Sequence, residues 1–79
     1  MTKEELLESI KEAISFTVPE IDTSDLKYED SLKEIGANSV DRAEILIMLM
    51  EDAGVKLPMV SFGEAKNIGE ILDIVLAAM

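Results

Sequence analysis

Ser39 is the residue whose type and position offer the most chemistry in this chain. It lies in the stretch Gly36-Ala37-Asn38-Ser39-Val40-Asp41-Arg42, where a loop gives way to a helical pattern. The first backbone N–H groups of a helix have no partner inside the helix, and the helix dipole makes that end positive. One interpretation is that Asn38 or Ser39 caps the helix, since both residue types are favoured there. The other is that Ser39 is a covalent attachment point, where the helix end would stabilise a phosphate ester.

Composition argues against an enzyme with Ser39 as its nucleophile. A catalytic serine needs a neighbouring base, and the chain contains no histidine. No lysine lies near Ser39 in the sequence to replace it. Cysteine is also absent, so the chain has neither a disulfide nor a thiolate metal site. We therefore expect no enzymatic activity, no catalytic residue and no metal ligand.

The chain resembles an acyl carrier protein over essentially its full length. In that family a Gly-x-Asp-Ser-Leu motif opens the second helix, and its serine carries phosphopantetheine. Here the motif is Gly36-Ala37-Asn38-Ser39-Val40, so asparagine stands where most members have aspartate. The run continuing to Arg42 is similar to that of freestanding donor carriers in polyketide β-branching cassettes. The resemblance implies phosphopantetheine bound covalently to Ser39.

The same resemblance implies a set of partners. A phosphopantetheinyl transferase would attach the arm, and an acyltransferase and a decarboxylating ketosynthase would leave an acetyl group derived from malonyl. An HMG-CoA-synthase-like enzyme would then condense that acetyl group with a ketone on another carrier. Two other hypotheses stay open: a fatty-acid or peptidyl carrier with the same arm, and an unmodified acidic helical adaptor.

The composition indicates one small acidic domain spanning residues 1–79. Seventeen acidic residues against seven basic ones give a net charge of −10 at pH 7, so the surface repels nucleic acid and anionic membranes. No apolar run approaches the ~20 residues that span a bilayer, and no signal-peptide core follows the N-terminus. We expect a cytoplasmic monomer that binds neither nucleic acid nor membrane.

Periodicity predicts an all-α fold, a small four-helix bundle with three longer helices and one short third helix. A capping-box pattern of Thr2 with Glu5 predicts the first helix from about residue 3, and Pro19 ends it. Its predicted apolar stripe is Leu6, Ile10, Ala13, Ile14 and Thr17. A long loop over residues 19–38 follows, with a single helical turn expected over 30–34. Its predicted anchors are Ile21, Leu26, Tyr28, Leu32 and Ile35.

The chain after the second helix carries clear stop signals. Gly54 ends that helix, and Pro58 prevents an immediate restart. A short irregular helical turn is expected within residues 59–66, with Val60 and Phe62 as core contacts.

The final helix is expected to begin at a capping pair, Asn67 with Glu70. Gly69 in its first turn weakens it slightly. Its predicted buried face consists of Ile68, Ile71, Leu72, Val75 and Leu76.

The second helix, from Val40 to about Asp52, is apolar on two sides. One stripe suffices to join a core, so the second indicates either deep burial or a surface left for a partner. We expect the core face to consist of Ile45, Leu46 and Leu49. The outward side is predicted to carry Val40, Ala43, Ile47 and Met50. Burial of all these residues is the alternative.

Charge completes the predicted docking surface. Residues 37–53 hold four acids and one arginine, a local charge of −3, which would speed the encounter with a basic partner. Arg42 is unusual for the family and either selects a partner or is a solvated surface residue. The predicted partner-binding residues are Asn38, Val40, Asp41, Arg42, Ala43, Glu44, Ile47 and Glu51.

Overall fold

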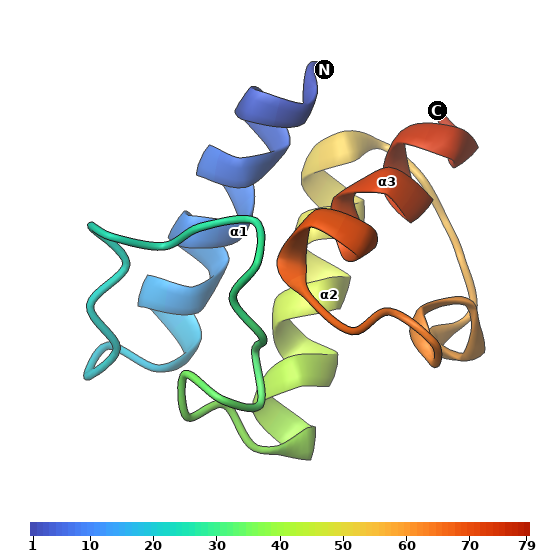
Figure 1. The fold of residues 1–79 in the computed structure, drawn as a ribbon. Coiled ribbons are helices and arrows are strands. Elements are labelled where there is room, and N and C mark those ends of the chain that lie inside the picture. Colours follow the sequence, from blue (N-terminus) through green and yellow to red (C-terminus); the bar gives the residue numbers. More distant parts are fainter.

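All regular secondary structure of the protein is helical in the computed structural model, which describes residues 1–79 (Figure 1). The elements in chain order are α1 (Lys3–Thr17), α2 (Ser39–Ala53), the 3-10 turn η1 (Met59–Phe62) and α3 (Ile68–Ala78). The predicted short third helix is therefore one 3-10 turn, and the fold is a four-helix bundle only when η1 is counted. None of the helices has the length and apolar character needed to cross a membrane.

Local signals set where the helices begin and end. The Thr2 hydroxyl accepts a hydrogen bond from the Glu5 N–H at 3.1 Å, and the Glu5 carboxylate accepts one from the Thr2 N–H at 2.8 Å, which confirms the predicted capping box of α1. Helix α1 ends at Thr17, two residues before Pro19. Gly54 ends α2 in the left-handed conformation, with φ of 73°, as its residue type predicts.

The core is a single cluster of buried aliphatic side chains to which all three α-helices contribute. Its members from the helices are Leu6, Ile10, Ala13, Ile14, Ile45, Leu46, Leu49, Met50, Ile68, Ile71, Leu72 and Val75. The predicted stripe of α1 is confirmed except for Thr17, which is half-buried, and Leu76 of α3 is likewise only half-buried. The predicted core face of α2 is also confirmed.

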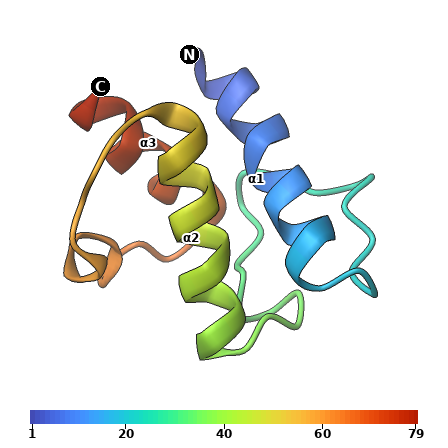
Figure 2. The ribbon, with the colours of Figure 1, turned by 180° about the vertical axis from the view of Figure 1, so that it is seen from behind.

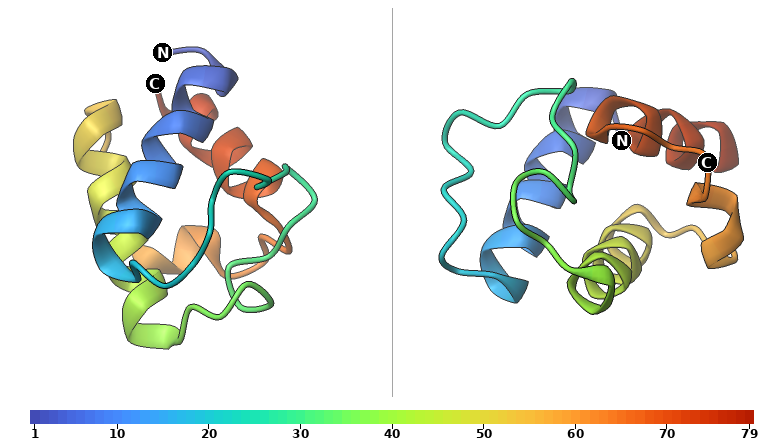
Figure 3. Two further views of the ribbon diagram at one scale, coloured as in Figure 1. Left: turned by 90° about the vertical axis from the view of Figure 1, so that its left-hand side faces the viewer. Right: turned by 60° about the horizontal axis from the view of Figure 1, so that its bottom comes forward.

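Helix α1 packs along α2 and more lightly against α3, whereas α2 and α3 make little backbone contact with each other. Viewed from behind, α1 and α2 lie side by side (Figure 2). The Thr17 hydroxyl at the end of α1 donates a hydrogen bond to the Met48 sulfur of α2 at 3.7 Å. Both chain termini lie at one end of the molecule, and the N-terminal end of α2 lies at the other (Figures 1 and 3).

The loop over residues 19–38 is fixed to the core and to α3. Its predicted anchors are confirmed, because Leu26 and Leu32 are buried and the other three pack against the core. The carbonyl oxygens of Asp30 and Tyr28 accept hydrogen bonds from the first two N–H groups of α3, those of Ile68 and Gly69, both at 2.8 Å. A Cβ at Gly69 would lie 3.2 Å from the Tyr28 Cβ, so glycine permits this close approach.

The end of the loop forms a turn that leads into α2. The Ile35 N–H bonds the Ser31 carbonyl at 3.0 Å, and the Ala37 N–H bonds the Leu32 carbonyl at 3.0 Å. The single helical turn predicted over residues 30–34 is thus confirmed, as a turn over residues 32–36. Gly36 closes it at φ of 110°, a conformation that favours glycine, and Ala37 is buried. This turn fixes the direction in which α2 starts.

Candidate functional site

Asn38, rather than Ser39, caps helix α2. The Asn38 Oδ1 accepts a hydrogen bond from the Asp41 N–H at 2.8 Å, and the Asp41 carboxylate accepts one from the Asn38 N–H at 3.2 Å. The sequence left open which of the two residues is the cap, and the structure decides for Asn38. Helix α2 consequently begins at Ser39, one residue earlier than predicted.

The Ser39 side chain therefore takes no part in capping the helix. Its side chain is exposed, and its hydroxyl has no hydrogen-bond partner in the protein. The backbone N–H groups of Ser39 and Val40 also have no partner, because the first intrahelical bond of α2 joins the Arg42 N–H to the Asn38 carbonyl at 2.9 Å. A phosphate ester on Ser39 would lie beside two unpaired donors at the positive end of a helix. The residues here fit a phosphate-linked group.

Helix α2 presents part of its predicted docking surface to solvent. Val40 is 73% exposed and Ile47 is 45% exposed, and Glu44 and Glu51 are exposed on the same helix. These four residues of the predicted partner-binding set are open to another protein. Asn38 is exposed as well, although its side chain is engaged in the cap.

Three predictions about the placement of apolar residues are wrong, and two of them concern Met50 and Val60. Met50 is only 7% exposed and belongs to the core, where its sulfur accepts a hydrogen bond from the Leu57 N–H at 3.4 Å. Val60 was expected in the core but is 81% exposed, because Phe62 of the same 3-10 turn is the residue that points inward. With the partly exposed Met59, Val60 adds a second apolar element near α2.

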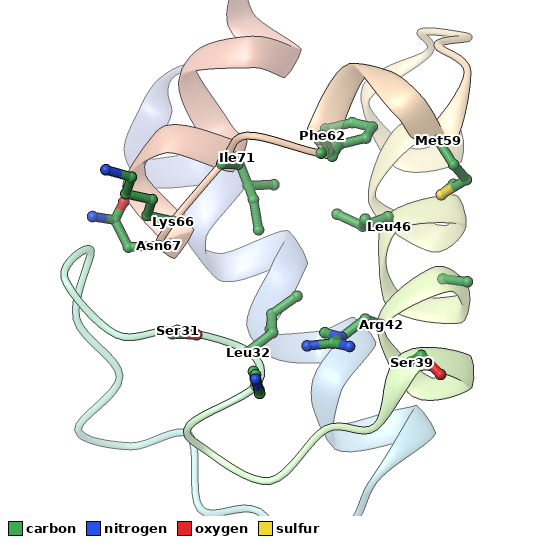
Figure 4. Close-up of a pocket in the computed structure, with 14 residues that line it drawn as sticks. Ser31, Leu32, Ser39, Arg42, Leu46, Met59, Phe62, Lys66, Asn67 and Ile71 are labelled. Atoms are coloured by element: carbon green, nitrogen blue, oxygen red, sulfur yellow. The ribbon is translucent and has the colours of Figure 1, made fainter.

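A cavity of about 460 Å³ lies between α2, η1, the start of α3 and the turn before α2 (Figure 4). On α2 it is lined by Ser39, Arg42, Ala43 and Leu46, which recur at the three- and four-residue spacing of one helix face. Arg42 and Ala43 are half-buried and face this cavity, so the outward placement expected for Ala43 is wrong. Figure 4 shows the Arg42 side chain reaching toward Leu32, with Ser39 at the rim and its hydroxyl turned away from the guanidinium.

Sequence reasoning missed two basic residues at this site. Lys33, from the turn before α2, and Lys66, just before α3, line the same cavity as Ser39 and Arg42. They are 33 residues apart in the chain, and no local pattern joins them. Both lysine side chains are exposed. No group of three or more metal-ligating side chains gathers anywhere in the structure.

Comparison with known proteins assigns the family. Residues 5–75 match the family model described as the phosphopantetheine attachment site. The chain belongs to the acyl carrier proteins that bear this group. Phosphopantetheine is thus its cofactor, a flexible arm whose phosphate is esterified to a protein hydroxyl and whose terminal thiol holds acyl groups as thioesters.

Two similar proteins refine the comparison. The carrier is 40% identical over 74 residues to the polyketide biosynthesis acyl-carrier-protein AcpK of Bacillus subtilis, with 94% of this chain and 90% of that protein covered. Among solved structures it matches a chain in the crystal structure of the curacin biosynthetic pathway HMG synthase in complex with acetyl donor-ACP. That match has a TM-score of 0.86 and 44% identity, and covers 98% of this chain and 99% of the other. Because nearly the whole matched chain is covered by 79 residues, that chain is the carrier of the complex.

Proposed function

We propose that Ser39 is the residue to which phosphopantetheine is attached. The observation that carries this assignment is the division of roles at the start of α2, where Asn38 caps the helix and leaves the Ser39 hydroxyl free. The other serines lack this setting: Ser9 is buried, and the Ser24 hydroxyl donates a hydrogen bond to the Asp22 carboxylate at 2.7 Å. Ser39 alone opens an α-helix.

We further propose that the carrier is the acetyl donor of a polyketide β-branching cassette. An acyltransferase would load malonyl, a decarboxylating ketosynthase would convert it to acetyl, and an HMG-CoA-synthase-like enzyme would take the acetyl group. The support is the 44% identity, over nearly the full chain, to the carrier in the complex of an HMG synthase with its acetyl donor. The carrier would do no chemistry itself, since it only binds, positions and delivers the acyl group.

The docking surface for the synthase would centre on the exposed side of α2. Val40 and Ile47 supply apolar area, and Glu44 and Glu51 supply the negative charge that steers a basic partner surface. Val60, on η1, extends the apolar area. Exposed apolar side chains of this size, rimmed by charge, are typical of protein–protein interaction sites.

Loading is tested by incubating the purified protein with coenzyme A and a broad-specificity phosphopantetheinyl transferase, then measuring the intact mass. We expect a gain of one phosphopantetheine in the wild-type protein and in Ser31→Ala, and none in Ser39→Ala. Ser31 is a suitable control because it lines the same cavity without opening a helix. A folded wild-type protein that gains no mass would favour the unmodified acidic adaptor.

Docking is tested by acetyl transfer from the loaded carrier to an HMG-CoA-synthase-like enzyme. Val40→Glu places a charge at the centre of the proposed surface, and we expect it to lower transfer at least tenfold. Phe16→Glu is its matched control, since Phe16 is 76% exposed on α1 and lines a different hollow from Ser39. Equal transfer by the two variants would show that Val40 lies outside the interface. Transfer of longer acyl or aminoacyl groups in place of acetyl would favour a fatty-acid or peptidyl carrier.

A further inference from the structure

The cavity beside Ser39 has a charge opposite to that of the protein. Three of the seven basic residues of the chain line it, namely Lys33, Arg42 and Lys66, and none of the 17 acidic residues does. Every other hollow of the surface is lined by at least two carboxylates. In a protein of net charge −10, this cavity is thus the hollow that attracts an anion.

The three cations have no partner within the protein. The salt bridges of the structure join Lys3 to Asp73 and Lys11 to Glu8, so no carboxylate lies within ion-pair distance of the cavity cations. Lys33 and Lys66 are exposed and Arg42 is half-buried. Figure 4 places Arg42 on the α2 side of the cavity and Lys66 at its opposite edge, beside Asn67. Figure 4 shows the Lys66 ammonium group turned outward, so this exposed side chain would have to rotate inward for an anion in the cavity to meet positive charge from both sides.

The base of the cavity is apolar. Leu32, Leu46, Phe62 and Ile71 line it, and each belongs to the buried core cluster. A volume of about 460 Å³ falls within the roughly 300–1,000 Å³ of sites that bind small molecules. An apolar base beneath a few cations suits a short organic chain that ends in a negative charge.

We propose that this cavity binds the free carboxylate of a short dicarboxylic acyl group, malonyl in kind, carried as a thioester on the arm at Ser39. This inference rests on the proposed function, because the arm brings the acyl group to the cavity. Arg42 follows Ser39 by three residues on the same helix face and lies on the attachment side. Lys33 and Lys66 flank the remainder of the cavity and would hold the carboxylate.

Decarboxylation would then release the cargo. The bond between the α-carbon and the carboxylate breaks, carbon dioxide leaves, and the α-carbon takes up one proton, so the thioester becomes acetyl. The product has no charge for the cations to hold. The cavity would therefore retain the malonyl form and free the acetyl form for delivery to the next enzyme.

The test compares two cargoes that differ by one charge. The carrier is loaded with malonyl or with its carboxamide isostere, malonamyl, from the corresponding coenzyme A thioesters, and loading is verified by intact mass. We expect the backbone amide NMR signals of residues 31–33 and 63–67 to differ between the two loaded forms. Both loaded forms contain the same phosphodiester, so its effect on the NMR signals cancels in the comparison. About 1 M salt, where the screening length is about 3 Å, should remove most of the difference.

Two variants with the same net charge distinguish an effect of the cavity cations on these NMR shifts from an effect of the protein's overall electrostatic field. Lys33→Gln/Lys66→Gln removes two cavity cations, whereas Lys27→Gln/Lys56→Gln removes two exposed cations that do not line the cavity. We expect the first variant to lose most of the malonyl-specific shifts and the second to keep them. If the double cavity variant does not fold, either single substitution replaces it, with about half the loss expected.

Superimposable spectra of the malonyl and malonamyl forms would overturn the inference and leave the carrier function intact. Differences that survive in Lys33→Gln/Lys66→Gln would also overturn it. Shifts at these residues that appear equally in both loaded forms, relative to the unloaded protein, would assign the cations to the phosphodiester instead. Failure of Ser39 to be loaded would overturn the proposed function and this inference together.

Discussion

Helices α1 and α2 show how one architecture serves two purposes. Both have 15 residues, both start with a capping box, and they pack along each other through aliphatic side chains. Among the large apolar residues of α1 only Phe16 is exposed, whereas α2 leaves Val40 and Ile47 in solvent and lines the cavity with a further face. Helix α1 is thus mainly a core element, and α2 is both a core element and the presenting surface.

The difference is sharpest at the first residue of each helix. Lys3 opens α1, and its ammonium group pairs with the Asp73 carboxylate at 2.9 Å and lies 5.1 Å from the centre of the Tyr28 ring. Ser39 opens α2 and contacts no partner through its hydroxyl. The same capping geometry therefore leaves one side chain tying the fold together and the other available for chemistry.

Substitutions in the core should have the largest effect on the free energy of unfolding, and that effect should be similar in α1 and α2. Ile10→Ala on α1 and Leu49→Ala on α2 each remove a fully buried side chain, so each should lower the free energy of unfolding by about 2–5 kcal/mol. Ile47→Ala, on the outward side of α2, should lower it by less than about 1 kcal/mol. Urea denaturation measures all three. A cost for Ile47→Ala equal to that for Leu49→Ala would show that the outward side is buried in solution.

Substitutions of the two helix caps should have the next largest effect on the free energy of unfolding, and the loss should again be similar for α1 and α2. Thr2→Ala and Asn38→Ala each leave one N–H group of a helix end without its partner, which costs about 1 kcal/mol. Urea denaturation of the two variants, with Ser15→Ala as an exposed serine control within α1, measures the difference. A much smaller cost for Asn38→Ala would mean that another residue caps α2.

Asn38→Asp should leave the stability of the protein nearly unchanged but alter its transfer of acetyl to the partner enzyme. Asparagine and aspartate cap helices about equally well, so the free energy of unfolding should change by less than about 0.5 kcal/mol. The new charge lies beside the attachment serine, and we expect acetyl transfer to the synthase-like partner to change several-fold, as we do for Arg42→Gln. If transfer kinetics were the same in both variants as in the wild type, neither residue would be a determinant of specificity.

The smallest expected effect is the pH dependence of the α1 cap. Hydrogen bonds from Thr2, its backbone N–H first, lower the pKa of the Glu5 carboxyl below its ordinary value. Because the charged form is the one bonded in the folded state, its contribution is present above the ordinary pKa and disappears as pH falls through the lowered one. The difference in stability between wild type and Glu5→Gln should therefore narrow between about pH 5 and pH 3.

Much of the fold follows from local sequence signals. The caps at Thr2 and Asn67, the stops at Pro19 and Gly54, and the buried faces of the helices depend on neighbouring residues, so periodicity and residue type predict them. Asn67 caps α3 as predicted, although the Glu70 carboxylate accepts from the Lys66 N–H rather than completing a box with Asn67.

What the sequence could not predict depends on distant parts of the chain. Gly69 was expected only to weaken its helix, yet it permits the close approach of the loop at Tyr28. Met50 and Val60 were misplaced because periodicity alone does not determine how far a helix or a 3-10 turn is rotated toward the core. Lys33 and Lys66 meet at one cavity only because the loop and the start of α3 are joined by backbone hydrogen bonds.

The central claim is that capping and attachment are divided between neighbouring residues, and loading combined with stability tests it most directly. Asn38→Ala and Ser39→Ala are each treated with coenzyme A and a broad-specificity transferase, and intact mass and urea denaturation are measured on both. We expect Asn38→Ala to lose about 1 kcal/mol and still accept phosphopantetheine. Ser39→Ala should change stability by less than about 0.5 kcal/mol and accept none. Loading of Ser39→Ala, or a loss of stability in it equal to that of Asn38→Ala, would contradict the claim.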